Sequence, residues 1–291
     1  MPLTDERALR WLGLKYASKH AAGFFVKDGK INMSCNDATL TQDPTGITCV
    51  CWAADWSRLA FPIITTSHKY AAALMTTTIP DVPIVAPWPA FLMRIPNGML
   101  SLEHDGELIN LRHAMVVNAI DYWYCLAIAE NDMSISRTGF TTAAMRAGDV
   151  HASTSDGDSL TTHDARALTA ITRLIMNACL AMSDPRSVRP VGKATPAPTI
   201  DSTGMPKYKG GTFQVGGPVS VDCRQPLAEF LLGVPHSKST MRWLVRGHWR
   251  NQACGPNLTS RAMKWIEPYW KGERENALLI RHHELRRATE Q

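Results

Sequence analysis

The sequence WLVRGHWRNQACGPNLTSRAMKWIEPYW, residues 243–270, contains four of the nine tryptophans of the chain. Apolar side chains stand at odd positions near its start, namely Trp243, Val245 and Trp249. Basic side chains stand at the even positions Arg242, Arg246, His248 and Arg250. This period of two predicts a strand over residues 241–250 with one apolar and one basic face.

The residues that follow predict a second strand that returns along the first. Cys254-Gly255-Pro256-Asn257 is a turn sequence, and residues 263–266 are predicted to form a second short strand that ends before Pro268. Gly247 interrupts the first strand, as glycine does at a bulge or where another group must approach the backbone closely. The segment is therefore predicted to be a basic, tryptophan-rich two-stranded ribbon.

The positive charge of the chain is concentrated around this ribbon. From His236 to the C-terminus there are 11 Lys and Arg against 5 Asp and Glu, a balance of +6. The totals are 31 and 26, so the preceding residues have 20 against 21, a balance of −1. Such a concentration indicates contact with nucleic acid or the ribosome, contact with an acidic protein surface, or a basic face that is only solvated.

Length and cysteine content limit the class of protein. The 291 residues, 45% of them hydrophobic, allow a large core at the size where one core tends to split in two. Seven cysteines without a Cys-x-x-Cys spacing favour reduced thiols. The N-terminus, MPLTDERALR, does not resemble a secretory signal, and no apolar run approaches the ~18 residues of a membrane span. We expect a cytoplasmic protein with no membrane partner.

The rest of the chain predicts a mixture of helices and strands. Helices are expected at 4–23, 67–77 and 161–183, the last being the strongest, with Thr161 or Thr162 as its N-cap. Strands are expected at 90–95, 106–111, 113–119 and 122–129, the last at the centre of an antiparallel sheet. Residues 146–159 are predicted to be a surface loop, 210–217 a glycine-framed hairpin or turn, and 224–232 a short helix capped by Asp222.

We therefore predict an α+β protein with an antiparallel sheet, packed helices and a small basic β-rich C-terminal module. Residues 1–183 are expected to form an α+β lobe that includes the long helix. Residues 184–209, which are rich in proline, are expected to form a linker or extended crossing segment. Residues 210–291 are expected to form the basic module.

No catalytic, metal or cofactor site is predicted. The sequence GGTFQVGG lacks the Lys-Ser/Thr pair of a phosphate-binding loop, and no G-x-S-x-G sequence occurs. His236, His248, Cys223 and Cys254 have no zinc-site spacing. Asp121 and Glu130 are the best candidates for acids with a perturbed pKa, although a position at a strand edge or end is the commoner explanation.

The predicted binding residues all lie in or beside the ribbon. Trp243 and Trp249 are expected to form a small apolar core under it. Exposed rings among Trp265, Tyr269 and Trp270 would stack on bases or on apolar side chains, with arginines binding phosphate or carboxylate. The complete set is Arg242, Arg246, His248, Trp249, Arg250, Arg261, Lys264, Trp265, Tyr269 and Trp270.

The sequence Arg246-Gly247-His248-Trp249, followed by a glycine loop and a basic, aromatic strand, resembles the C-terminal part of a family of phage and mobile-element proteins. This family includes anti-CRISPR proteins that act against the type V-A effector nuclease. The resemblance continues upstream at residues 87–91, 122–129, 179–185 and 213–216. The first 80 residues have no counterpart in it.

The resemblance implies a phage-encoded, non-catalytic anti-defence protein. Members of the family lower production of the nuclease at translation, so the implied partner is a protein, a nascent chain or a translating complex, with RNA or ribosome close by. Two alternatives remain open. One is a general RNA- or DNA-binding protein that uses the ribbon, and the other is a nuclease or other enzyme whose acids or histidines the sequence does not reveal.

Overall fold

The computed structural model describes the chain in thirteen stretches. Three predicted features lie outside them, namely the first helix, the acids Asp121 and Glu130, and Arg242. The described residues are 23–27, 30–34, 62–88, 90–104, 106–119, 122–129, 134–141, 151–154, 161–193, 195–202, 206–217, 219–233 and 243–271.

A nine-stranded sheet in the order β10-β13-β3-β4-β6-β7-β8-β9, with β5 added to β6, forms the base of the fold. Most pairs are antiparallel, but β3 runs parallel to both β4 and β13. The predicted α+β class is confirmed, although this end of the sheet is mixed. The strands are β3 (Ile63–Thr65), β4 (Ala90–Arg94), β5 (Ser101–His104), β6 (Glu107–Ala119), β7 (Tyr122–Ala129), β8 (Ser134–Thr141), β9 (His151–Thr154), β10 (Val188–Val191) and β13 (Thr212–Val215).

The centre of the sheet agrees with the predicted alternation. β7 lies between β6 and β8, and Trp123, Cys125 and Ala127 on its one face are buried. The two strands predicted at 106–111 and 113–119 are one strand, β6, with a register irregularity between Leu111 and His113. A bulge shifts the side-chain alternation by one residue, which is why the sequence pattern resembled two separate strands.

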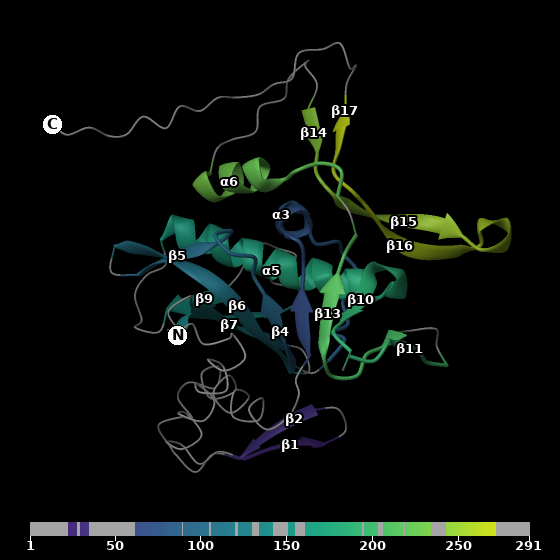
Figure 1. Cartoon of the computed structure of the whole chain (residues 1–291), viewed down its shortest axis with the longest axis horizontal. Coiled ribbons are helices and arrows are strands. Elements are labelled where there is room, and N and C mark those ends of the chain that lie inside the picture. Colours follow the sequence, from purple (N-terminus) through teal and green to yellow (C-terminus); the bar gives the residue numbers. More distant parts are fainter. Residues whose placement is uncertain are drawn as a thin grey trace.

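Helices cover one face of this sheet. Figure 1 shows α3 (His68–Thr76) and α5 (Thr162–Met182) along the sheet, with α6 (Arg224–Leu232) on top of them. Thr161 caps α5 as the sequence predicts, and Ser67, the first residue of the predicted helix 67–77, caps α3. Each side chain accepts a hydrogen bond from a backbone N–H of the first turn. The length and composition of α5 would also suit a membrane span, but 78% of its most apolar window is buried inside the protein.

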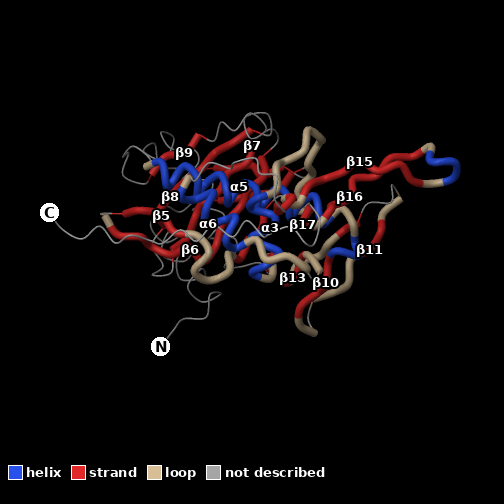
Figure 2. The backbone as a smooth tube through the Cα atoms, turned by 90° about the horizontal axis from the view of Figure 1, so that it is seen from above, coloured by secondary structure: helices blue, strands red, loops and turns tan. Residues whose placement is uncertain are grey.

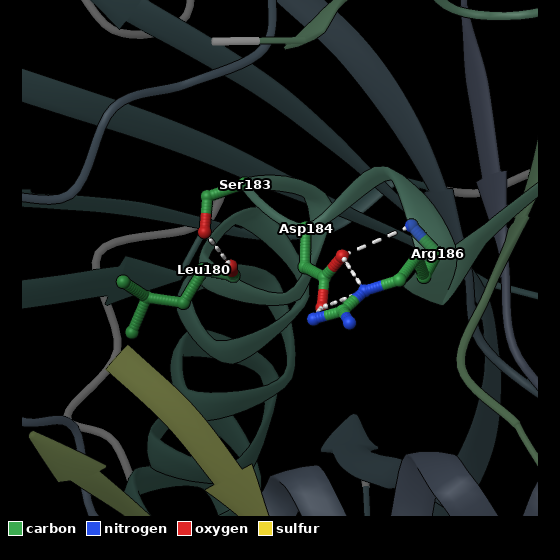
Figure 3. A network of polar contacts seen from close by, with 4 residues as sticks. All are labelled: Leu180, Ser183, Asp184 and Arg186. Carbon is green, nitrogen blue, oxygen red and sulfur yellow. Dashed lines mark hydrogen bonds and ion pairs between the residues drawn. The ribbon is translucent and has the colours of Figure 1, made fainter. Parts of the chain in front are cut away.

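The end of α5 is fixed by local polar contacts, which Figure 3 shows from close by. The Ser183 hydroxyl donates to the Leu180 carbonyl at 2.6 Å. The Asp184 carboxylate accepts from the backbone N–H of Arg186 at 3.1 Å and from its guanidinium at 2.8–3.2 Å. These hydrogen bonds hold the pKa of Asp184 below its usual value. They set the turn through Pro185–Ser187 that leads from α5 into β10.

The structure corrects the predictions for two segments that carry no strong pattern. Residues 210–217 were expected to form a hairpin or turn, but they contain β13, which lies between β10 and β3. Its Phe213 and Val215 are buried, and burial of this alternate pair places the short strand inside the sheet. Residues 151–154, predicted to be loop, form the edge strand β9. The division into a lobe at 1–183, a linker or crossing segment at 184–209 and a basic module at 210–291 stays a prediction.

The C-terminal ribbon, residues 243–271, consists of two short, separate ladders that run in different directions (Figure 1). β14 (Trp243–Val245) pairs with β17 (Tyr269–Lys271), and β15 (His248–Cys254) pairs with β16 (Ser260–Ile266). Figures 1 and 2 show the β15–β16 hairpin, which we call the arm, extending away from the helices and the sheet. The predicted turn is confirmed at its tip, where residues 255–259 connect the two strands. Small hairpins β1–β2 (Gly23–Lys27, Lys30–Ser34) and β11–β12 (Thr199–Ile200, Pro206–Lys207) complete the described elements.

The backbone just after β13 passes against the ring of Tyr70 at Gly216. This glycine has φ +102°, and a Cβ atom built there would lie 2.5 Å from the Tyr70 ring. We expect Gly216→Ala to lower the free energy of unfolding by about 2–4 kcal/mol, because it adds both a steric clash and an unfavourable backbone conformation. Urea denaturation of the full chain measures this loss.

Gly217→Ala is the matched control, since a Cβ atom at Gly217 meets nothing within 4 Å. We expect its effect to stay within about 0.5 kcal/mol of the wild type. Equal effects of the two substitutions would contradict the packing of Gly216 on Tyr70.

Candidate functional site

One buried amide attaches the ribbon to the helices. The indole Nε1 of Trp249 donates to Oδ1 of Asn177 at 2.9 Å. Nδ2 of Asn177 donates in turn to the carbonyls of Leu74 and Thr77, both at 3.0 Å. Asn177 is fully buried, so its three hydrogen bonds fix the direction of the amide and join α5, the end of α3 and the arm.

Gly247, two residues before Trp249, permits the close approach of the ribbon backbone to Thr77. A Cβ atom at Gly247 would lie 2.9 Å from Oγ1 of Thr77 and 2.9 Å from Cζ2 of Trp265. Trp265 lies opposite Trp249 in the β15–β16 register, and its ring contacts that of Tyr70 edge-on at 5.0 Å. Gly247, Trp249 and Trp265 therefore belong to the packing of the arm on the core.

The exposed rings of the ribbon are those of Tyr269 and Trp270 in β17. They keep 42% and 39% of their surface exposed. Trp265 was included among the candidates for exposed rings, but it packs against the core, which corrects that part of the prediction. Binding by the two exposed rings stays a prediction.

The outward face of the arm carries an unneutralised pair of basic side chains. Arg250 and Lys264 are opposite each other in the register, and both are exposed, as is His248 on the same face. Among the described residues neither cation forms an ion pair. Like charges directly opposite each other on a two-stranded ribbon are destabilising, so an anionic partner would stabilise this face.

The tip of the arm adds a third cation and an apolar side chain. Arg261 is exposed on the opposite face from Arg250, where its guanidinium lies 3.5 Å from the Asn251 carbonyl. Leu258 is 65% exposed. Asn257 and Leu258 both have positive φ, 53° and 57°, which is unusual for leucine. The basic residues of the arm therefore lie on both faces.

Arg246 does not share the exposed basic face that the alternation predicted. It is half-buried between β14 and β15, and burial lowers its pKa while Glu229 and Cys223 act in the opposite direction. The ladder is interrupted at Arg246 and Gly247, so the even-numbered Leu244 and the odd-numbered Trp249 both pack against the core. The prediction of a single basic face from Arg242 to Arg250 is therefore wrong at Arg246.

A family model described as AcrVA2-like, the anti-CRISPR type V subtype A2 family, matches residues 65–272. The chain belongs to this family. The match begins at the end of β3 and ends just after β17, so it includes the helices, most of the sheet and the whole ribbon of this AcrVA2-like chain. It also reaches into the first 80 residues, for which the sequence resemblance found no counterpart.

A similar chain among the solved structures is described as the crystal structure of AcrVA2. It is 12% identical over 81% of this chain and 77% of that chain, with a TM-score of 0.33. No curated protein matches this AcrVA2-like chain. Family membership makes it an anti-CRISPR-like protein that takes part in evasion of host defence against phages.

Sequence reasoning missed the residues that hold the ribbon in place. Asn177 lies within the apolar stretch of α5, where every residue from Leu174 to Met182 is buried. A lone amide in such a stretch is a signal, because a buried amide requires partners. Its partners Leu74, Thr77 and Trp249 lie far away in the sequence, so the sequence alone does not identify them.

The attachment of the arm can be tested by removing one hydrogen-bond donor. Trp249→Phe leaves Oδ1 of Asn177 without its partner, and we expect a loss of about 1–2 kcal/mol in the free energy of unfolding. Trp249→Ala also removes the packed ring, so the expected loss rises to about 3–5 kcal/mol.

Trp270→Phe serves as the control because that ring is partly exposed, and we expect a change within about 0.5 kcal/mol. Urea denaturation followed by circular dichroism avoids dependence on the altered tryptophan signal. A tolerated Trp249→Ala would contradict the role of this ring as the anchor of the arm.

Proposed function

We propose that this AcrVA2-like protein is a non-catalytic anti-defence protein that recognises a protein target through the outward face of the ribbon. The family description, anti-CRISPR type V, supports the effector of that system as the target. We propose that the protein recognises this effector as a mature protein or as a nascent chain on the ribosome. The protein would act in the cytoplasm of the host cell. The observation that carries the proposal is the exposed, unneutralised pair Arg250 and Lys264 on a projecting arm.

The chemistry of this face favours a partner with an acidic surface. Arg250 and Lys264 repel each other in the free protein, and carboxylates of a partner would remove that repulsion. Leu258 at the tip and the rings of Tyr269 and Trp270 offer apolar contact at the two ends of the ribbon. Aromatic rings and arginines are the side chains that most often dominate binding energy at protein interfaces.

Reversal of charge on the arm tests this proposal. We expect the double variant Arg250→Glu with Lys264→Glu to remain folded and to lose at least tenfold in affinity for its target, about 1.4 kcal/mol or more. The target is first captured with tagged wild-type protein from cells that express a type V-A system, and then identified by mass spectrometry and RNA sequencing.

The matched control is Arg189→Glu with Lys209→Glu, which makes the same change of charge at exposed positions outside the ribbon. We expect this control to bind as the wild type does. Equal binding by the arm variant and the wild type, both folded, would refute the assignment of the arm.

A second function, general RNA or DNA binding, is favoured by the exposed rings of Tyr269 and Trp270 beside Lys271. Stacking of aromatic rings on bases together with basic side chains is a common way to hold single strands. The two functions predict different salt dependence. Nucleic acid of any sequence that is lost from the protein at about 0.3 M salt would support the second function, whereas a defined protein retained under these conditions supports the first.

A further inference from the structure

The tip of the arm has a defined backbone conformation. Residues 255–259 connect β15 to β16, and their hydrogen bonds are local. The Leu258 N–H donates to the Gly255 carbonyl at 3.1 Å. Both the N–H and the hydroxyl of Thr259 donate to the Pro256 carbonyl, at 3.3 and 3.0 Å. The turn is therefore held by its own contacts, which set the direction of the backbone at Leu258.

This conformation is strained at Leu258. Asn257 and Leu258 both lie in the left-handed region, with φ of 53° and 57°. Asparagine adopts this region more readily than other residues with a side chain, whereas a bulky leucine is unfavourable there. Burial does not offset this strain, because 65% of the surface of Leu258 is exposed. The stability of the free protein therefore does not explain a leucine at this position, and such strain is typical of residues that contact a ligand.

The tip lies far from the body of the protein. β15 continues for five residues beyond Trp249, roughly 17 Å at the rise of a β-strand, and Figures 1 and 2 show that the tip is the far end of the arm. Trp249 and Trp265 pack against the core at the base of the arm. Beyond them, exposed residues lie on both faces, Asn251 on one and the pair Gln252 and Ala262 on the other. A two-stranded ribbon in water is only marginally stable, so contact with a partner would stabilise this part of the arm.

The strands that lead to the tip carry positive charge alone. Residues 248–266 contain Arg250, Arg261 and Lys264 but neither Asp nor Glu. All three basic side chains are exposed. The arm therefore presents one projecting apolar side chain with cations behind it, and the complementary surface is an apolar pocket with carboxylates around its rim.

We propose that Leu258 is the anchor of the arm and inserts into an apolar pocket of the protein partner, with acidic side chains at the rim of that pocket. The anchor rests on the proposed function for the identity of this partner. An aliphatic or aromatic side chain in a desolvated pocket, surrounded by polar contacts that exclude water, is a common centre of a protein interface. A lipid surface suits this tip less well, because a single leucine provides too little apolar area for stable insertion.

The stability of variants at the tip gives the first test. Leu258→Asn introduces a residue that tolerates the left-handed region, and we expect it to raise the Tm of the full-length chain by about 1–3 °C. Leu258→Met keeps both the apolar side chain and the strain, so its Tm should stay within about 1 °C of the wild type. A lower Tm for Leu258→Asn would mean that the leucine serves the free fold, and would overturn the proposal.

Photo-crosslinking tests the contact directly. A photoreactive apolar amino acid replaces Leu258 in the full-length chain, in cells that express a type V-A system. The control replaces Leu232 of α6, because both leucines are 65% exposed. We expect a crosslinked protein from position 258 alone, joined at a site of apolar residues close to Asp or Glu. The absence of a protein crosslink from position 258 would overturn the anchor.

Affinity for the crosslinked partner, purified by itself, measures the contribution of the side chain. We expect Leu258→Asn to bind at least tenfold more weakly than the wild type, and Leu258→Met to stay within about threefold. Two controls should bind as the wild type does. Asn257→Gly relieves strain but keeps the leucine, and Leu232→Asn removes an equally exposed leucine outside the ribbon. Wild-type affinity of Leu258→Asn would contradict the anchor.

Two other occupants are tested with the purified protein. Vesicles that contain phosphatidylserine probe a lipid surface, and sedimentation probes a second copy of the chain. We expect neither binding to the vesicles nor self-association to depend on Leu258. Loss of vesicle binding in Leu258→Asn would overturn the choice of a protein, and loss of a dimer would overturn the choice of a different protein as partner.

These outcomes are distinguishable from failure of the proposed function. If Leu258→Asn loses the partner while Arg250→Glu with Lys264→Glu retains it, the apolar anchor stands, and the basic face and the acidic rim fail. If the charge variant alone loses the partner, the basic face stands and the anchor fails. A crosslink from position 258 to a protein other than the type V-A effector keeps the anchor and overturns the proposed target.

Discussion

The hydrogen bonds of Asn177 are the constraint on which the arrangement of the C-terminal ribbon depends. An amide buried in an apolar helix is stable only when its donors and acceptor are satisfied, and here α3 takes both donors while Trp249 supplies the partner for the acceptor. The amide geometry therefore decides where the arm leaves the body. Because Gly247 allows the backbone to approach Thr77, the joint of the ribbon rests directly on the end of α3.

Because of this attachment, the side chains of the ribbon fall into groups with different roles. Trp249 and Trp265 are partly buried and pack against the core, so they hold the arm. Arg250, Lys264 and Arg261 remain exposed on the arm, where no acidic side chain among the described residues neutralises them. Arg246 stands between these groups, half-buried at the root of the arm. Uncompensated positive charge at an exposed surface complements an acidic partner.

The elements with strong local signals could be predicted from the sequence. Ser67 and Thr161 mark the starts of α3 and α5 because their side chains satisfy backbone N–H groups of the first turn, and the aromatic alternation of Tyr122–Ala129 marks an interior strand. β13 could not be predicted in the same way. Its four residues between glycines have no local feature that distinguishes a turn from a strand. They form a strand because they pair with β3 and β10.

For the candidate site, the sequence by itself determined that a basic, tryptophan-rich ribbon lies near the C-terminus, since a period of two and a turn sequence are local properties. It also determined that the excess positive charge gathers there. Only the tertiary structure decided which of these side chains face the core and which remain free, because one irregularity at Gly247 shifts the alternation. The partners that cause this are Asn177 in α5 and Thr77 at the C-terminal end of α3. Both are far away in the sequence, so no local pattern contains them.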